Sequence, residues 1–357
     1  MLNDEDHKIC KSIISPGQST GMVRFVTIQR QGYMLLGLPQ DCRLALATLK
    51  LYQPQKRKGR LLRNLVRLSV SLRVYHLFPK CEFAIGNKGL IELLSKKFNT
   101  RAIGIILSSP VSQDRNLVAV FESENTLYVA KAGCGESEAV VRMEHERLMN
   151  FSGFVNGVPK VVGGYEMEDG FACVTEMVNG DSPLGAEQEA KVWDLLGSWM
   201  DQAQTMVMDT IPQWTKLNEK LKGRNPIAGI LDEMGKLRVL SPIGHGDFAP
   251  WNIKISSGKV IVLDWEYAVK QAIPGLDGLH YLIQKLILVD GLNPEAIYHR
   301  CLEWFDRKET KLYFQKARLK GYEEKILGVY LYYASEIDGY ERQDLIRIWN
   351  NRFIQEG

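Results

Sequence analysis

The sequence predicts an α+β protein with a small β-rich part followed by a larger helical part. From residue 101 to about residue 178, short apolar stretches alternate with polar turns, which is typical of consecutive strands. From residue 188 to residue 355, apolar residues instead recur at helical spacing in one segment after another. One hairpin interrupts the helical part, with strands expected at 252–255 and 260–263 around a turn at 256–258.

Composition limits the class of protein. A chain of 357 residues with 45% apolar residues exceeds one typical domain and can bury a sizeable core. The six cysteines lack metal-type spacing, so we expect reduced thiols in a cytoplasmic protein. Neither a signal peptide nor a run of 18 apolar residues is present. The six histidines show no ligand spacing, which argues against a metal-dependent hydrolase.

Basic residues are concentrated near the N-terminus. Residues 42–81 hold ten Lys and Arg and no Asp or Glu, which leaves 35 basic against 42 acidic residues in the rest of the chain. We expect strands at 22–28 and 33–38 and helices at 41–52 and 58–75. On the second helix Arg60, Arg63 and Arg67 share one face, and the leucines lie mostly off it.

Three interpretations of residues 42–81 remain open. In the first, the arginines form a solvated face while the leucines pack on the rest of the protein. In the second, the helix lies on an anionic membrane surface and attaches the protein peripherally. In the third, the segment binds an acidic ligand such as a phosphorylated glycan, a lipid-linked sugar or nucleic acid. Specific nucleic-acid binding is not expected, because no aromatic residues interleave with the charges.

The predicted hairpin carries three polar residues that suit phosphate chemistry. Asp247 and Asn252 lie in the string His-Gly-Asp-Phe-Ala-Pro-Trp-Asn that begins at residue 245, and Asp264 follows the second strand. Folding of the hairpin brings Asn252 beside Asp264, with Asp247 on the loop just before it. One carboxylate can orient an attacking hydroxyl, while an amide and a second carboxylate hold Mg²⁺. The pattern therefore predicts a Mg·ATP site.

This string, together with Asp264-Trp265-Glu266, resembles the catalytic segment of the aminoglycoside phosphotransferase/choline kinase family. The resemblance implies a two-lobed protein-kinase-like fold with an extra α/β N-terminal region. It implies that Asp247 is the catalytic base, that Asn252 and Asp264 bind Mg²⁺ and that His245 supports the loop. The expected divisions are an extension at 1–100, an N-lobe at 101–180 with a hinge at about 176–180, and a C-lobe at 181–357.

A lysine and a glutamate for the nucleotide can be found from the faces of two elements. Leu127, Val129 and Lys131 share one side of a predicted strand, so the ammonium group continues an apolar face and needs a partner. Glu144 lies in the middle of the apolar stripe of the following helix, whereas Glu146 turns away from it. We therefore expect Lys131 to pair with Glu144 and to bind the phosphates of ATP.

Two further parts of a nucleotide site follow from the resemblance and from chain order. The polar turn before Leu117 lacks a glycine-rich motif, but the hydroxyls of Ser108 or Ser109 and the backbone amides there can contact phosphate. The strand end from Glu176 to Val178 is the expected hinge, whose backbone groups recognise adenine. Asp277 resembles the residue that starts a helix and braces the catalytic loop.

The function that the sequence predicts is an ATP-dependent phosphotransferase acting on a hydroxyl of a small molecule. A sugar, an aminoglycoside, an amino alcohol and a polysaccharide precursor all stay open, because no motif in the variable helices identifies the acceptor. The alternative is a catalytically silent nucleotide-binding scaffold. In the helical part we expect helices at 188–208, 213–223, 225–237, 276–289, 294–306, 309–335 and 341–355, with five tryptophans in the core.

Overall fold

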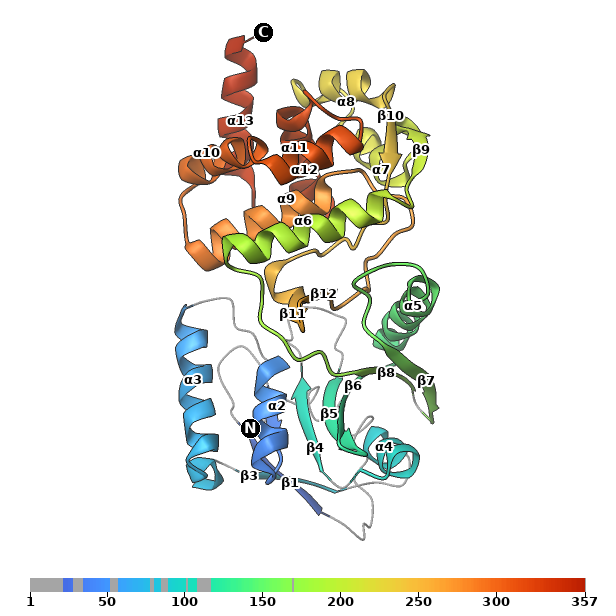
Figure 1. The fold of residues 1–357 in the computed structure, drawn as a ribbon, viewed down its shortest axis with the longest axis vertical. Coiled ribbons are helices and arrows are strands. Elements are labelled where there is room, and N and C mark those ends of the chain that lie inside the picture. Colours follow the sequence, from blue (N-terminus) through green and yellow to red (C-terminus); the bar gives the residue numbers. More distant parts are fainter. Residues whose placement is uncertain are drawn as a thin grey trace. The chain divides into compact units, whose positions relative to one another are not determined.

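The α+β class is confirmed by a computed structural model, in which a β-rich part precedes a helical part (Figure 1). The structure describes residues 22–27, 35–51, 57–77, 80–84, 89–100, 102–107, 117–168 and 170–356. They fall into two compact units. The first unit comprises Met1–Gly153 and Pro159–Val178, and the second comprises Phe154–Val158 and Asn179–Gly357.

The first unit contains an antiparallel sheet in the strand order β3-β1-β2-β4-β5-β6-β8-β7. The strands are β1 (Met22–Thr27), β2 (Leu35–Leu38), β3 (Lys80–Ala84), β4 (Ile103–Leu107), β5 (Leu117–Ser123), β6 (Thr126–Cys134), β7 (Val161–Met167) and β8 (Gly170–Glu176). The two strands expected at the N-terminus are therefore present, and with β3 they continue the same sheet as the later strands.

Helices cover both faces of this sheet (Figure 1). They are α2 (Cys42–Leu51), α3 (Arg57–Ser71), α4 (Leu90–Phe98) and α5 (Glu136–Phe151). Ile105 and Ala119 pack with Leu94 of α4, whereas Val120 packs with Leu44 of α2. Successive strand residues point to opposite faces, so this alternation builds one apolar core on each side.

Helix α3 only partly meets the expectation that its leucines pack on the rest of the protein. Val66 and Val70 are buried, and Leu62 packs against the same cluster. Leu61 and Leu65, by contrast, are exposed. The buried face of α3 therefore consists of the valines, and most of the leucines lie on the opposite side.

The second unit is mainly helical (Figure 1). Its helices are α6 (Ala186–Met200), α7 (Pro212–Leu221), α8 (Ile227–Gly235), α9 (Leu276–Gln284) with a π-helical turn at Lys285–Asp290, α10 (Pro294–Phe305), α11 (Lys308–Lys316), α12 (Glu323–Glu336) and α13 (Gln343–Glu356). Two antiparallel strand pairs accompany them. One joins β9 (Gln204–Val207) with β10 (Arg238–Ser241) across α7 and α8, and the other is the hairpin of β11 (Ile253–Ser256) and β12 (Lys259–Val262).

Two of the helices predicted in the second unit were wrong in extent. The helix expected over 188–208 ends at Met200, because residues 204–207 pair as a strand with β10. The helix expected over 309–335 is two helices, α11 and α12. Between them, Arg318 and Gly321 have φ of 63° and 85°, a left-handed conformation that a right-handed helix cannot include.

The five tryptophans expected in the core are buried, as predicted. They are Trp193, Trp199, Trp214, Trp304 and Trp349. The four cysteines whose side chains the structure describes (Cys42, Cys134, Cys173 and Cys301) are free thiols. No helix in the described ranges is both long enough and apolar enough to cross a bilayer.

Candidate functional site

The β11–β12 hairpin sets the geometry of the candidate site in the second unit. Ser256 pairs with Lys259 across the turn, and the two turn residues, Ser257 and Gly258, have φ of 49° and 78°. Positive φ at both positions is typical of the tight turn that matches strand twist. At the open end the Leu263 amide donates to the Asn252 carbonyl at 2.7 Å, so Asp264 directly follows the residue bonded to Asn252.

The side-chain amide of Asn252 is oriented by Asp247. Its Nδ2 donates to the Asp247 carbonyl and to Asp247 Oδ2, both at 2.9 Å. Because both partners are acceptors, the nitrogen must lie on this side and Oδ1 on the other. The amide oxygen of Asn252 is thus directed away from Asp247, in the orientation that cation binding requires.

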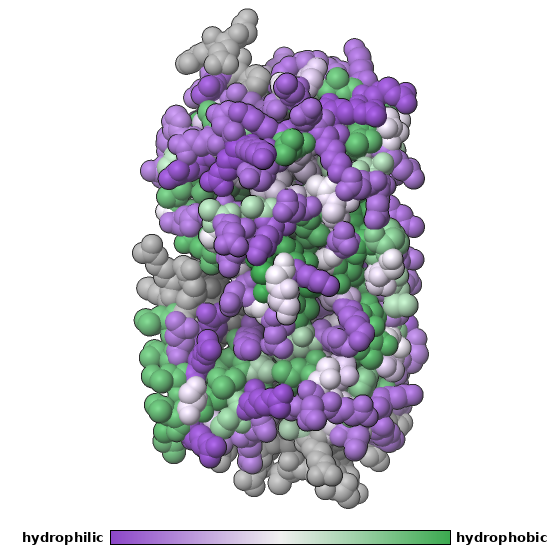
Figure 2. Space-filling model, viewed as in Figure 1, coloured by the Kyte–Doolittle hydropathy of each residue, from purple (hydrophilic) through white to green (hydrophobic). Residues whose placement is uncertain are grey.

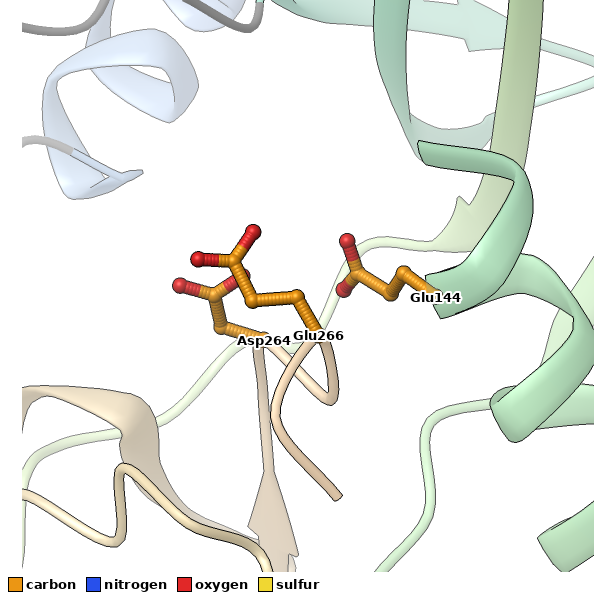
Figure 3. Close-up of side chains that lie close together, drawn as sticks. All are labelled: Glu144, Asp264 and Glu266. Atoms are coloured by element: carbon orange, nitrogen blue, oxygen red, sulfur yellow. The ribbon is translucent and has the colours of Figure 1, made fainter. Parts of the chain in front are cut away.

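Asp264 and Glu266 place two carboxylates on the segment after β12. Their oxygens lie within 4.8 Å of each other, and Figure 3 shows both side chains extending from this segment. Asp264 has φ of 66°, a conformation that costs free energy in a residue other than glycine and is more often found in Asp than in most residues. Carboxylate oxygens are ligands that Mg²⁺ prefers. The sequence-based set of metal ligands did not include Glu266.

His245 links the catalytic loop to the chain just before Asp264. Its Nδ1 accepts from the Asp247 amide at 3.3 Å, so Nε2 carries the proton and donates to the Leu263 carbonyl at 2.9 Å. The side chain is fully buried and its ring packs against Trp265. These contacts favour a supporting role for His245 over proton transfer.

Asp277 braces the same loop from the first turn of α9. Its carboxylate accepts the amides of His245 at 2.7 Å and Gly246 at 3.1 Å. Gly246 has φ of 85°, and a Cβ there would lie 2.7 Å from Tyr267, so the loop needs glycine at this point. The bracing contact expected of Asp277 is therefore present.

His280, on α9, is a contact of Asp247 that the sequence reasoning missed. Its Nε2 donates to Asp247 Oδ1 at 3.1 Å, and its Nδ1 lies 3.3 Å from the Tyr330 hydroxyl. Burial by itself would raise the pKa of Asp247, but the hydrogen bond and charge of His280, together with the hydrogen bond of Asn252, outweigh it and lower that pKa. Asp247 is therefore held as a carboxylate at neutral pH.

A pocket lies beside this network within the second unit. Its polar lining comes from α7, α9, α12 and the chain after α12, and from the catalytic loop. The lining residues are Gln213, Gly246, Asp277, His280, Tyr330, Tyr333 and Asp338. Burial raises the pKa of the Asp338 carboxyl from 3.8 to about 6, against the opposing effect of His280. Hydroxyls, carboxylates and an imidazole thus surround a space that reaches the residues holding Asp247.

Replacement of Asp338 by asparagine is expected to flatten the pH dependence of stability. The folded protein holds the Asp338 proton more tightly than the unfolded chain does. The stabilisation of the folded state by this bound proton is therefore fully present below pH 3.8 and is lost as the pH rises through about 6. Urea unfolding of wild type and Asp338→Asn between these limits measures the difference, with the exposed Asp232→Asn as control. Parallel curves for wild type and Asp338→Asn would contradict this prediction.

The ion pair predicted in the first unit is present. Lys131 Nζ lies 2.7 Å from Glu144 Oε2, with side chains 17% and 7% exposed. Leu127 and Val129 precede Lys131 on the same face of β6 and pack against the α2 side of the sheet. Glu144 projects from α5, as Figure 3 shows, and α5 lies against β6 and β8. The carboxylate thereby offsets the cost of placing an ammonium group on this face.

The two remaining predictions concern contacts with the phosphates and with adenine, and the structure describes only the second segment. Ser108 and Ser109 lie outside the described residues. At the expected hinge, the amide of Glu176 donates to the Lys160 carbonyl at 2.9 Å, and its carboxylate pairs with the Lys160 ammonium. The Met177 amide donates to the Leu127 carbonyl at 2.8 Å. Two of the three amides from Glu176 to Val178 are therefore used within the sheet.

Solved structures similar to this chain are phosphotransferases and a kinase of small molecules. A thermostable mutant of aminoglycoside phosphotransferase APH(4)-Ia, in complex with ADP and hygromycin B, is 15% identical (TM-score 0.46) over 75% of this chain and 98% of its own. Spectinomycin phosphotransferase APH(9)-Ia, with ADP and spectinomycin, is 11% identical (TM-score 0.41), covering 75% and 93%. Choline kinase LicA from Streptococcus pneumoniae is 16% identical (TM-score 0.40), covering 74% and 95%.

Sequence comparisons add no further relatives. No protein-family profile matches the chain. No curated protein matches it either.

Proposed function

We propose that this protein is an ATP-dependent phosphotransferase of the aminoglycoside phosphotransferase/choline kinase family, acting inside the cell on a hydroxyl of a small molecule. The observation that carries the proposal is the hydrogen-bonded network around Asp247. Asn252 and His280 each hold one oxygen of its carboxylate, and Asp264 follows the residue bonded to Asn252. A catalytic loop of this composition suits phosphoryl transfer, which relies on positioning and charge more than on covalent chemistry.

Asp247 acts on the acceptor hydroxyl in this proposal. An ionised carboxylate has about four acceptor positions, of which Asn252 and His280 take two. A further position accepts the hydrogen bond of the acceptor hydroxyl and then its proton. The acceptor oxygen forms a bond to the γ-phosphorus while the bond from that phosphorus to the β–γ bridging oxygen breaks, and ADP leaves.

The donor set suits Mg²⁺. Asn252 would contribute its amide oxygen and Asp264 its carboxylate, with Glu266 as an additional oxygen ligand, and hard oxygen ligands are those that Mg²⁺ prefers. When bound, the ion offsets negative charge on the phosphates. Asp247 is not among the proposed metal ligands, because its remaining acceptor positions are assigned to the acceptor hydroxyl.

The first unit would bind the nucleotide. Lys131, oriented by Glu144, is proposed to contact the α- and β-phosphates, and Ser108 and Ser109 remain proposed phosphate contacts. Among the hinge amides, those of Glu176 and Met177 already donate within the sheet, so adenine recognition falls to the Val178 amide. The side chain of Glu176 is paired with Lys160 and is not proposed to touch the nucleotide.

We propose that the acceptor hydroxyl lies near the polar pocket beside His280 and Asp338, whose cavity of about 20 Å³ has room for one small group of the acceptor and not for the whole molecule. Carboxylate, phenol and imidazole groups there can donate and accept hydrogen bonds, which suits a hydroxyl or amine group of the acceptor. A sugar, an aminoglycoside, an amino alcohol and a polysaccharide precursor all meet this description. The alternative to catalysis is a scaffold that binds nucleotide without turnover.

ADP release from Mg·ATP, measured against a panel of these acceptors, tests the proposal. We expect one acceptor class to stimulate turnover, and EDTA to abolish it. Lys131→Ala should weaken ATP binding by about tenfold or more, because a charge-assisted contact to phosphate is lost. Lys97→Ala, which removes an exposed lysine on α4 of the same unit, is the matched control. ATP binding without stimulated turnover by any acceptor would favour the scaffold, and no ATP binding would overturn the proposal.

A further inference from the structure

Helix α3 presents a line of leucines to solvent. Leu61, Leu65, Leu68 and Leu72 are 63%, 55%, 55% and 62% exposed. Spacings of four, three and four residues place them on one side of the helix and just beyond its end. Exposed leucines are ordinary when scattered, but an aligned set forms a continuous apolar strip. We call these four residues the leucine strip.

Two more exposed apolar residues follow the end of α3. Val74 and Leu77, in the following turn, are 46% and 86% exposed. Six of the thirteen large apolar residues that are exposed in the described part of the chain thus fall within residues 61–77. Figure 2 shows apolar side chains gathered over α3, at the lower left of the view. This concentration is difficult to attribute to chance, so the surface needs an explanation.

The opposite face of α3 fixes the strip in its outward position. Val66 and Val70 are 5% and 0% exposed and pack with Leu38 and Tyr75. Rotating the helix to bury the leucines would bring these two valines into water. Burying a valine side chain contributes about 1.5–3 kcal/mol. The fold therefore uses one apolar face of α3 for its core and leaves a second one available.

The charge around the strip indicates its partner. Residues 42–81 contain ten basic residues and no acidic ones. On the helix itself Arg67 is exposed on a side next to the leucines, whereas Arg63 is half-buried on the side away from them. A helix with exposed leucines on one side and basic residues on another is the pattern of a helix that lies in the interface of an anionic bilayer.

We propose that α3 docks this protein on an anionic lipid surface, with the leucine strip inserted among the acyl chains and the arginines at the headgroups. A second copy of the chain is a poorer partner, because packing two such helices together would bring basic residues together without acidic ones to offset them. Nucleic acid would match the charge but would leave the leucines in water.

Vesicle sedimentation with the full-length protein tests this docking. We expect binding to phosphatidylcholine vesicles that contain phosphatidylglycerol, weaker binding to phosphatidylcholine alone, and a decrease in high salt. Leu65→Gln/Leu68→Gln should weaken binding by about tenfold or more, because two apolar side chains no longer enter the bilayer. Leu312→Gln is the matched control, since Leu312 is also 55% exposed on a helix, α11.

A second variant separates charge from apolar insertion. Arg67→Gln should reduce binding to the anionic vesicles by roughly fivefold and leave binding to phosphatidylcholine alone unchanged. Since all the substituted side chains are exposed, unfolding midpoints should not change, and circular dichroism checks this. Absence of binding by wild type, or equal binding by the double leucine variant, would overturn the proposal. A dimer that becomes a monomer in the double variant would instead assign the strip to a second copy.

Discussion

Asp247→Asn is expected to lower kcat for phosphoryl transfer by about 10²–10⁴-fold, with little change in ATP affinity. The amide oxygen of the variant can keep one of the two side-chain hydrogen bonds, and the bond from Asn252 to the backbone carbonyl of residue 247 is unaffected, so the loop should keep its shape. It cannot accept the proton of the acceptor hydroxyl, whereas the wild-type carboxylate, whose pKa is lowered, is ionised at neutral pH. Steady-state ADP release and calorimetric ATP binding measure the two effects separately.

The matched control for this prediction is Asp232→Asn, which replaces an exposed aspartate on α8. Its turnover should equal that of wild type. If Asp247→Asn also retained full turnover, Asp247 would not be the group that orients the acceptor. If the variant lost ATP binding as well, the loss of activity could not be assigned to proton acceptance.

Asp277→Ala is expected to lower both stability and turnover. The change leaves the amides of His245 and Gly246 without their shared acceptor; the bond from His245 is partly buried, and the one from Gly246 is exposed. A buried donor without a partner costs about 1–3 kcal/mol, so we expect a loss of roughly 1–3 kcal/mol in the free energy of unfolding, mainly from the His245 amide. Turnover should fall because the loop that carries Asp247 loses its anchor on α9.

The Asp277→Asn variant tests how much of the stability loss comes from the missing hydrogen bonds. Its amide oxygen can keep one of the two hydrogen bonds, and the neutral group suits the site because burial raises the pKa of Asp277. The stability loss should therefore be smaller than for alanine. Urea unfolding and kcat of both variants give the comparison. Equal stability of wild type and Asp277→Ala would show that the loop does not depend on this carboxylate.

Several of the site's features could be predicted from the sequence, because they depend on local geometry. The alternation of a strand put Lys131 on the face of Leu127 and Val129, and the period of a helix put Glu144 on its apolar stripe. These two periodicities are enough to predict the ion pair that the structure contains. The β11–β12 hairpin was predictable for the same reason, because its turn residues and register involve neighbours in the chain.

Contacts between distant segments were not available from the sequence. His280 lies 33 residues after Asp247, and only the packing of α9 against the catalytic loop joins them. Likewise, the break between α11 and α12 depends on Arg318 and Gly321 adopting left-handed φ, although apolar residues on both sides continue at helical spacing. Neither feature leaves a periodic signal, because each is fixed by the surfaces that the helices must bury.

The sequence by itself determined the α+β class, the Lys131–Glu144 pair and the hairpin that holds Asn252 and Asp264 close together. Only the tertiary structure decided which face of α3 is buried, since both its valines and its leucines could serve as an apolar stripe. It also decided that Asp247 is held by His280. Local sequence patterns indicate which residues of a segment can be buried or hydrogen-bonded. The packing of the whole unit determines which residues of other segments they contact.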